Sequence, residues 1–388
     1  MKHPYRALGG LPRALWIVAG ANLVNRAGTM VLPFLALYLT RARGLPEGGT
    51  AALFAVYGAT SLAAGLVAGR LSDALGPRRV LVVSLGASAV VLGLFPFATS
   101  FAAVAVACAA FAVTSEAVRP ANMTLTGSLV PAERRKDAFV LNRLTTNLGM
   151  SVGPAVGGLL TSVDFRLLFW IDGATSLAAA LVLALVLRGR DALAAPAHAR
   201  AHSRGALRDR RFLRVLVGVV FVALVFFQLE AAMPLYLVGE VGVPTKLYGV
   251  LFAINTVGIL LFEVPLNGAL AGVANGRVLT AGALVCGAGF GAFALVHGAL
   301  GAAACIAVVT VGEMLLFPGM STLVADLSPE GRAGEYMGAY SMAFALAYAI
   351  GPAVGAEVLA RFGALVLWPG VAATAVVATL LFASATRA

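Results

Sequence analysis

The chain has 388 residues, of which 60% are hydrophobic and only 12% charged, and its mean hydropathy is +0.93. Soluble domains carry about 25% charged residues, so this composition excludes an ordinary soluble protein and indicates one that spans a membrane several times. The formal net charge of +11 would suit a nucleic-acid partner, but the positions of the basic residues explain it otherwise.

Apolar segments of about 20 residues, the length that a helix needs to cross a bilayer core, recur along the whole chain. We therefore predict an all-α membrane protein with twelve transmembrane helices and both termini in the cytoplasm. The predicted segments are 14–39, 50–69, 80–98, 101–127, 138–162, 167–187, 212–238, 246–269, 278–296, 299–324, 334–359 and 363–384.

The basic residues follow the order of these segments. With a cytoplasmic N-terminus, twenty of them fall on the cytoplasmic side and five on the outer side. This is the positive-inside bias, so the charge reports topology, and we expect no nucleic-acid partner. The five outer residues are Arg41, Arg43, Arg166, Lys246 and Arg361.

Several other functional classes find no support in the sequence. The three cysteines lie in apolar segments and are interpreted as small hydrophobic residues rather than as a disulfide or metal framework. No Gly-x-x-x-x-Gly-Lys-Ser/Thr run for ATP occurs, and the four histidines form no catalytic or metal-binding group. We therefore expect neither an enzyme nor a primary pump, and neither a cofactor nor a bound metal.

The chain repeats itself at an offset of 198 residues. LVPAERRKDAF…VGPAVGG (129–158) aligns without a gap to LSPEGRAGEYM…IGPAVGA (327–356). Two pseudo-symmetric six-helix halves follow, 1–188 and 212–388, joined by an arginine-rich cytoplasmic linker at 189–211. Repeated halves of this kind are typical of secondary transporters.

The stretch GRLSDALGPRRVL, 69–81, resembles the cytoplasmic loop signature of the major facilitator superfamily. Ala74 and Pro77 depart from the pattern, which usually has basic residues there. The resemblance implies the fold of that superfamily and a latch that stabilises its outward-facing state. In the second half Gly272 replaces the aspartate, so we expect the latch on one side only. The latch residues are Gly69, Asp73, Gly76, Arg78 and Arg79.

A second stretch, GMSVGPAVGG at 149–158, resembles the antiporter motif on the fifth helix of proton-coupled multidrug exporters. Glycines four residues apart share one helix face and admit a neighbouring helix, and a proline there removes an amide donor. The alternative is ordinary packing by small residues, because the second half carries a copy at 351–355. The motif residues are Gly149, Gly153, Pro154, Gly157 and Gly158.

Ionisable residues inside the predicted membrane helices are candidates for function, because each is costly unless it is paired or faces water. Glu116 and Arg119 lie three residues apart on one face of the fourth helix, and Arg26 on the first helix can face them. We hypothesise that Glu116 is the main proton acceptor; the alternative is a permanent structural ion pair. Glu313 or Glu230 offers a second acidic site for protons or cationic substrate.

Polar side chains on the helices that line the cavity in this superfamily are candidates for substrate binding. Asn22, Asn25 and Arg26 in NLVNRAGTM recur at helical spacing and form one polar stripe. Each such residue alone is more often a packing or hydrogen-bonding group between helices. Asp172, on an outer helix, is expected to cap a helix or to snorkel. The other candidates are Glu116, Asn142, Arg143, Asn147, Gln228, Glu230, Tyr236, Asn255, Glu263, Glu313 and Tyr340.

Together with the resemblance, these features predict a secondary active transporter that works by alternating access and exports small amphiphilic or drug-like compounds in exchange for protons. NxxNR at 22–26 is also similar to the ExxER of proton-coupled peptide importers, with both glutamates replaced by asparagine. Proton-coupled or facilitated uptake of a small peptide or other zwitterionic solute is therefore the alternative. We expect a monomer in the cytoplasmic (inner) membrane of a bacterium, with a small-molecule substrate, protons and membrane lipids as its partners.

Overall fold

The computed structural model describes residues 8–45, 47–161, 163–187, 205–229 and 232–386. Contacts within the chain divide it into two compact units. The first turns of the eleventh predicted helix belong to the unit that contains the N-terminal half. Residues 189–204 of the predicted linker lie outside the described residues. The N-terminal unit comprises Leu11–Ser203 and Ser328–Met342, and the C-terminal unit comprises Met1–Gly10, Arg204–Leu327 and Ala343–Ala388.

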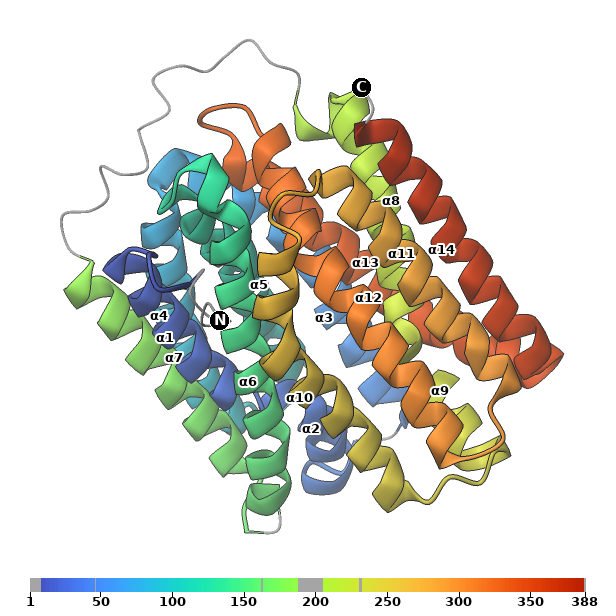
Figure 1. Cartoon of the computed structure of the whole chain (residues 1–388). Helices are drawn as coiled ribbons and strands as arrows, with labels where there is room; N and C mark the ends of the chain where they lie inside the picture. The colour runs from blue at the N-terminus through green and yellow to red at the C-terminus, as the bar shows by residue number, and fades with distance from the viewer. Residues whose placement is uncertain (1–7, 46, 162, 188–204, 230–231, 387–388) are drawn as a thin grey trace. The chain divides into compact units, whose positions relative to one another are not determined.

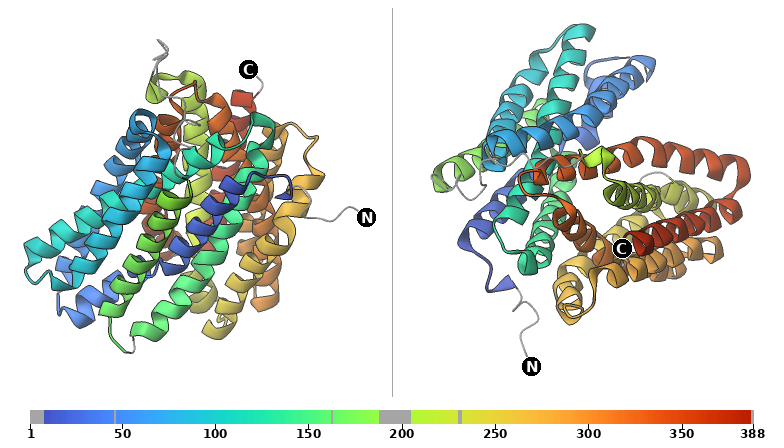
Figure 2. Two further views of the ribbon diagram at one scale, coloured as in Figure 1. Left: turned by 90° about the vertical axis from the view of Figure 1, so that its left-hand side faces the viewer. Right: turned by 90° about the horizontal axis from the view of Figure 1, so that it is seen from above.

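The helices of the N-terminal unit are α1 (Arg13–Gly28), α2 (Val31–Leu37), α3 (Glu47–Leu75), α4 (Pro77–Leu94), α5 (Phe101–Ser128), α6 (Arg135–Thr161) and α7 (Arg166–Val186). Helix α1 packs against both α6 and α7, and Figure 2 shows it running between them. Helix α3 packs against α5, and α4 packs against α5 and α7. A short π-helical segment, η2 (Tyr38–Ala42), a 3-10 turn, η3 (Phe95–Phe97), and another, η4 (Ala132–Arg134), complete the unit.

The C-terminal unit contains α8 (Arg210–Phe226), α9 (Ala232–Pro234), α10 (Thr245–Ala269), α11 (Asn275–Gly291), α12 (Ala299–Leu327), the later part of α13 (Ala333–Phe362) and α14 (Ala364–Thr386). Helix α11 packs against α12 and α14, as Figure 1 shows for α14, while α8 packs against α14 and α10 against α12. The shorter segments are η6 (Ala206–Arg208), η7 (Phe227–Leu229), η8 (Leu235–Glu240) and η9 (Ala292–Leu295).

The predicted order of twelve membrane helices is confirmed, with the first and the seventh interrupted. Ten helices among the described residues are long and apolar enough to cross a membrane. The other two are α6 and α10. Helix α6 is continuous, but polar and glycine residues interrupt its apolar sequence, and the apolar part of α10 is the shorter segment Ile254–Ala269.

The first predicted helix breaks at Thr29 and Met30, between α1 and α2. Pro33 explains this position, because it has no amide proton to donate to the carbonyl of Thr29 and is tolerated in the first turn of a new helix. Asp172 on α7 caps that turn, since its Oδ2 accepts hydrogen bonds from the backbone N–H groups of Met30 and Val31, each 3.3 Å long. The prediction that Asp172 caps a helix is confirmed.

The internal repeat extends into the aromatic cores of the two units. Phe95 in η3 and Phe293 in η9, 198 residues apart, are 1% and 0% exposed. Phe95 stacks on Phe169 with ring centroids 4.7 Å apart, and Phe293 packs against Trp368 at 5.1 Å. Each unit is therefore fixed at the corresponding place by large buried rings.

Candidate functional site

A carboxylate on α5 lies between two arginines in the N-terminal unit. Glu116 is half-buried and interacts electrostatically with Arg119, one turn further along α5, and with Arg26 on α1. The hydroxyl of Tyr57 on α3 donates a hydrogen bond to this carboxylate and lies 3.4 Å from Oγ of Ser115. Three helices thus bring the predicted proton-coupling residues Glu116, Arg119 and Arg26 together with Tyr57.

Asp172 completes the balance of charge around Arg26, which interacts through space with Arg119, Glu116 and Asp172. When all four groups are ionised, two positive and two negative charges cancel. When Glu116 binds a proton, one net positive charge remains. Because an uncompensated buried charge costs about 3–5 kcal/mol, protonation of this carboxylate is a strong electrostatic signal within the unit.

Arg119 also contacts the first part of α13, which belongs to the same unit. Its guanidinium carbon lies 6.0 Å from the centroid of the Tyr340 ring, the geometry of a cation–π interaction. Tyr340 is 1% exposed, so the contact is largely desolvated. The predicted substrate residue Tyr340 therefore packs against the charged cluster and joins α5 to α13.

The glycines of the antiporter-like motif on α6 explain how closely this helix approaches α1. A Cβ on Gly149 would lie 2.5 Å from Cβ of Arg26. A Cβ on Gly153 would lie 2.8 Å from the backbone oxygen of Thr29, at the helix break. Small residues permit such backbone contacts between membrane helices, so the motif holds α6 against the turn that carries Arg26.

The rest of this motif continues the same contact toward α2. A Cβ on Gly157 would lie 2.8 Å from Cε2 of Phe34, whereas one on Gly158 would make an ordinary contact of 3.8 Å with Cζ of the same ring. Helix α6 remains helical through Pro154. The requirement for glycine is therefore strongest at Gly149, Gly153 and Gly157.

The asparagines of the predicted polar stripe make hydrogen bonds within the N-terminal unit. Nδ2 of Asn22 donates to the Oγ1 atoms of Thr145 and Thr146, at 3.1 and 2.8 Å. Nδ2 of Asn25 donates to Oγ of Ser176 at 3.0 Å, and the two asparagines are 6% and 9% exposed. These amides tie α1 to α6 and α7, which favours helix packing over substrate contact for both.

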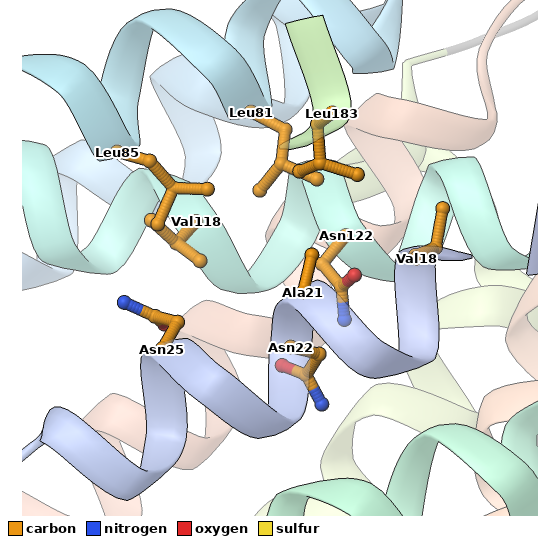
Figure 3. A pocket seen from close by; sticks show the side chains of 9 residues that line it. All are labelled: Val18, Ala21, Asn22, Asn25, Leu81, Leu85, Val118, Asn122 and Leu183. Carbon is orange, nitrogen blue, oxygen red and sulfur yellow. The ribbon is translucent and has the colours of Figure 1, made fainter. Parts of the chain in front are cut away.

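Asn142 belongs to the same network, because its Oδ1 accepts a hydrogen bond from Nδ2 of Asn122 at 2.7 Å. Figure 3 shows Asn22, Asn25 and Asn122 beside a small cavity among apolar side chains. Its volume is about 10 Å³, enough for roughly one water molecule and far below the ~300 Å³ or more of a small-molecule pocket. The cavity is an internal void of this unit rather than a substrate site.

The C-terminal unit holds a second buried carboxylate in a different environment. Glu313 on α12 is 2% exposed, and its Oε1 accepts a hydrogen bond from Nδ2 of Asn255 on α10 at 3.1 Å. The same Nδ2 donates to Oγ1 of Thr310 at 3.0 Å. Asn255 on α10 thus bridges the Glu313 carboxylate and the Thr310 hydroxyl of α12.

Two further candidates for substrate contact use their polar groups within the C-terminal unit. Nε2 of Gln228 donates to the backbone oxygen of Gly351 at 3.1 Å. The hydroxyl of Tyr236 donates to the backbone oxygen of Phe293 at 3.0 Å. Both contacts favour helix packing. Of the remaining candidates, Glu263 on α10 is fully buried, Arg143 and Asn147 on α6 are half-buried, and Glu230 lies outside the described residues.

The predicted latch residue Asp73, near the end of α3, caps the start of α13. Its Oδ1 and Oδ2 accept hydrogen bonds from the backbone N–H groups of Gly334 and Glu335, at 2.6 and 2.7 Å. Free amide donors and the helix dipole both favour a negative charge there. A Cβ on Gly69 would lie 2.2 Å from the backbone oxygen of Gly334, so the crossing requires glycine.

The other latch residues are placed differently. Nε and Nη2 of Arg78 donate to the backbone oxygens of Leu183 and Ala184, at 3.2 and 2.7 Å, so this side chain caps the C-terminus of α7. Gly76 forms the turn between α3 and α4 with a φ of 91°, which favours glycine, and Arg79 is exposed. The crossing with α13 thus depends on Gly69 and Asp73.

The corresponding stretch of the C-terminal unit is open. A Cβ on Gly268 or on Gly272 would meet no atom within 4 Å. Gly272 also lacks the carboxylate that caps a helix in the other unit. The one-sided latch stays a prediction.

Sequence reasoning missed Tyr57 and Thr310, which complete the two carboxylate clusters. The offset of 198 residues pairs Tyr57 with Asn255, and Ser115 with Glu313. The repeat therefore contained a usable signal, because it places a hydrogen-bonding side chain opposite the acidic position in both halves.

Comparisons with known proteins agree with this architecture. A family model described as Major Facilitator Superfamily matches residues 15–352 and 231–386. The chain is 26% identical over 335 residues to the uncharacterized MFS-type transporter YqjV of Bacillus subtilis, covering 84% of this chain and 82% of the relative. It is 25% identical over 361 residues to a Na(+), Li(+), K(+)/H(+) antiporter of Planococcus maritimus, covering 83% and 84%. The quinolone resistance protein NorA of Staphylococcus aureus is 23% identical over 158 residues, 41% of this chain and 40% of NorA.

Solved structures share the fold. The human organic anion transporter MFSD10 (TETRAN) matches with a TM-score of 0.76 at 17% identity, covering 95% of this chain and 99% of that one. A bacterial homologue of the iron transporter ferroportin in an outward-facing state matches with a TM-score of 0.79 at 16% identity, covering 96% and 99%. At such identities the likeness shows the fold alone.

Proposed function

Because the chain belongs to the major facilitator superfamily of secondary active transporters, and is thus a multi-pass membrane protein and not an enzyme, we propose that it exports small amphiphilic or drug-like compounds in exchange for protons. The transport cycle is alternating access between the two halves. The three curated relatives described above are bacterial, which supports the bacterial cytoplasmic membrane as its location.

The observation that carries this proposal is the cluster of Glu116, Arg119, Arg26 and Tyr57. A proton-coupled transporter needs a carboxylate that gains and loses a proton while its surroundings respond to the change. Glu116 has an arginine on its own helix and another on α1, together with a hydroxyl on α3. Protonation of this single group therefore alters electrostatic contacts among three helices.

The consequence reaches α13 through Arg119. With Glu116 ionised, Arg119 has a carboxylate partner beside it; with Glu116 protonated, that attraction is lost while the cation–π contact with Tyr340 remains. Tyr340 lies six residues, about 9 Å along a helix, beyond Gly334, which Asp73 caps. We propose that proton binding at Glu116 changes the strength of the latch through this segment.

The names of two relatives support exchange and drug export. NorA is a quinolone resistance protein, and the Planococcus maritimus relative is an antiporter that uses protons. The antiporter-like motif packs against the turn that bears Arg26, which joins the exporter signature to the proposed proton site. The proposed cargo is therefore a small amphiphile, and the proposed working unit is a monomer.

The alternative, uptake of a small peptide or other zwitterion, rested on the NxxNR stripe. Asn22 and Asn25 donate hydrogen bonds from Nδ2 to Thr146 and Ser176, which supports a packing role for both over contact with a peptide. No observation in the described residues favours uptake over export.

Replacement of Glu116 by Gln tests the proposal directly. Purified protein is reconstituted into liposomes, a pH gradient is imposed, and the initial rate of movement of ethidium, a planar hydrophobic cation, is followed by fluorescence. We expect Glu116→Gln to abolish movement driven by the gradient, because glutamine cannot bind and release a proton, while the protein still elutes as a monodisperse species.

Glu133→Gln is the matched control, because Glu133 is an exposed carboxylate on η4 and undergoes the same change from acid to amide. It should transport ethidium at the rate of the unmodified protein. Undiminished gradient-driven transport by Glu116→Gln would remove Glu116 from the coupling mechanism.

A further inference from the structure

Arginine side chains gather at the end of the C-terminal unit that the positive-inside bias assigns to the cytoplasm. Helix α8 begins here beside the end of α14, as Figure 1 shows. Nε of Arg211 donates a hydrogen bond to the backbone oxygen of Ala385 at 3.0 Å, and Nη1 of Arg214 donates to that of Ser384 at 3.4 Å. The C-terminus of α14 favours such positive charges through its helix dipole. The members of this basic cluster, all exposed, are Arg208, Arg210, Arg211, Arg214 and Arg277.

Arg277 joins the basic cluster through the first turn of α11. A Cβ on Gly276 would lie 2.5 Å from Cβ of Thr386, so this turn touches the last turn of α14. Within the described residues, the side chains of Arg208, Arg210 and Arg277 make no hydrogen bond or ion pair. Three of the five positive charges therefore remain available to a ligand.

The carboxylates at this end do not neutralise the basic cluster. Oδ1 of Asp209 accepts hydrogen bonds from the backbone N–H groups of Arg211 and Phe212, at 2.9 and 3.1 Å, and so caps α8. Because these amides already have an acceptor, an anion would bind to the arginine side chains and not to the helix terminus. Asp326 is exposed near the end of α12, which packs against α11. Five arginines beside two aspartates leave an excess of positive charge.

The exposed surface of α8 changes from basic to apolar within two helical turns. Arg210, Arg214 and Val217 follow at intervals of four and three residues and therefore share one helix face. Val217 is 43% exposed and lies about 10 Å along the helix axis from Arg210. On α14, Leu380 is 64% exposed and lies one turn before Ser384, whose backbone oxygen accepts the hydrogen bond from Arg214. Exposed apolar side chains thus lie directly on the membrane side of the arginines.

We propose that the basic cluster binds the headgroup of an acidic phospholipid of the cytoplasmic leaflet, with an acyl chain along Val217 and Leu380. The phosphate oxygens of such a lipid are strong acceptors for guanidinium groups. Four to eight basic residues immediately cytoplasmic of a membrane helix are typical of binding to anionic lipids. The apolar surface beside the arginines favours a lipid over a soluble anion, because only a lipid gains from covering it. A headgroup that contacts both Arg210 and Arg277 would hold the first turns of α8 and α11 against α14.

Lipid binding at the basic cluster needs neither Glu116 nor the transport cycle proposed above. The cluster belongs to the C-terminal unit, whereas Glu116 and its partners belong to the N-terminal unit. The two proposals can therefore fail independently.

The test is the thermal stability of the purified full-length protein in dodecyl maltoside, measured against increasing dioleoyl phosphatidylglycerol. Cys108, Cys286 and Cys305 are 0%, 2% and 8% exposed, so a fluorogenic maleimide reports their exposure on unfolding. A ligand that binds only the folded state raises the melting temperature in a saturable way. We expect such a rise with phosphatidylglycerol, but neither with the zwitterionic dioleoyl phosphatidylcholine nor with inorganic phosphate at equal ionic strength. Added salt should weaken the response, because it screens exposed charges.

The double variant Arg210→Gln/Arg277→Gln decides the assignment, because it removes two positive charges and keeps the hydrogen bonds between α8 and α14. Each basic residue strengthens binding to anionic lipid about fivefold, so the half-saturating concentration of phosphatidylglycerol should rise about 25-fold. The matched control is Arg13→Gln/Arg166→Gln, which removes two exposed arginines of the N-terminal unit and should respond like the unmodified protein.

A melting temperature without added lipid that equals that of the unmodified protein shows that each variant is folded. If Arg210→Gln/Arg277→Gln does not fold, Arg208→Gln carries the test with an expected shift of about fivefold. An equal rise with phosphatidylcholine or inorganic phosphate, an unshifted response in the cluster variant that folds, or an equal shift in the control would overturn the proposal.

Discussion

Each unit has a carboxylate at nearly the same position of the corresponding pair of helices. The two carboxylates have different neighbours. In the N-terminal unit α3 and α5 bring Tyr57 to Glu116, and in the C-terminal unit α10 and α12 bring Asn255 to Glu313. The internal repeat aligns Tyr57 with Asn255, whereas Glu313 aligns with Ser115, so the acidic position differs by one residue along the helix.

The difference shows that the repeated scaffold supplies the position and the neighbouring residues supply the chemistry. Around Glu116, arginines make the ionisation state matter to contacts between helices. Near Glu313, the Asn255 amide nitrogen donates hydrogen bonds to the carboxylate and to the Thr310 hydroxyl. The proposed conformational response to a proton depends on the first arrangement.

The largest expected effect concerns the crossing that only the N-terminal unit makes. Gly69→Ala should lower the initial rate of ethidium transport about tenfold or more, because a Cβ there would lie 2.2 Å from the backbone oxygen of Gly334. Loss of the Asp73 cap costs about 0.5–2 kcal/mol and overpacking about 1–3 kcal/mol, and 1.4 kcal/mol corresponds to roughly tenfold.

The matched change is Gly268→Ala, at the related position of the C-terminal unit, where a Cβ would meet no atom within 4 Å. Its rate, corrected for protein in the membrane, should equal that of the unmodified protein. Equal losses in both variants would show that the two crossings are not different after all.

A second pair of glycines tests how closely the antiporter-like motif packs in each unit. A Cβ on Gly153 would lie 2.8 Å from the backbone oxygen of Thr29, whereas one on Gly351, its counterpart in the repeat, would lie no closer than 3.5 Å to Leu224 or Phe227. Gly153→Ala should lower stability by about 1–3 kcal/mol, seen as a lower melting temperature in detergent. Gly351→Ala should be neutral or slightly stabilising, since alanine favours a helix over glycine by roughly 1 kcal/mol; the reverse order would contradict this packing.

A smaller effect is expected at the aromatic ring beneath Arg119. Cation–π contacts contribute about 0.5–2 kcal/mol, so Tyr340→Leu should slow transport by roughly 2- to 30-fold. Tyr340→Phe keeps the ring face and should lose several-fold less. Transport assays on equal amounts of reconstituted protein separate the two, and a leucine variant as active as the phenylalanine variant would exclude the cation–π contact from coupling.

The number and the order of the membrane helices could be predicted from the sequence, because apolar length and the positive-inside bias are strong signals. The helix breaks could not be. Pro33 was the local sign of the first break, but the cap that stabilises it comes from Asp172, 139 residues later in the chain. Long-range capping has no counterpart in local hydropathy.

The candidate site was only partly predictable. Spacing three residues apart brought Glu116 and Arg119 to one face, but nothing local distinguished polar groups that bind their neighbours from groups that remain available. Gln228, Tyr236 and Asn22 all have polar side chains in apolar helices, and each donates to a partner in another helix. That distinction depends on tertiary packing rather than on residue type.

The smallest expected effect tests this distinction within the N-terminal unit. Asn22 donates to Thr146 at 2.8 Å, whereas Nδ2 of half-buried Asn147 has no hydrogen-bond partner among the described residues. Hydrogen bonds between membrane helices contribute about 0.6 and at most roughly 1.7 kcal/mol. Asn22→Ala should therefore lower the melting temperature slightly and leave the half-saturating ethidium concentration unchanged. Asn147→Ala should leave the melting temperature unchanged and alter the half-saturating ethidium concentration. An altered half-saturating concentration in Asn22→Ala alone would instead indicate that the polar stripe of α1 contacts the substrate.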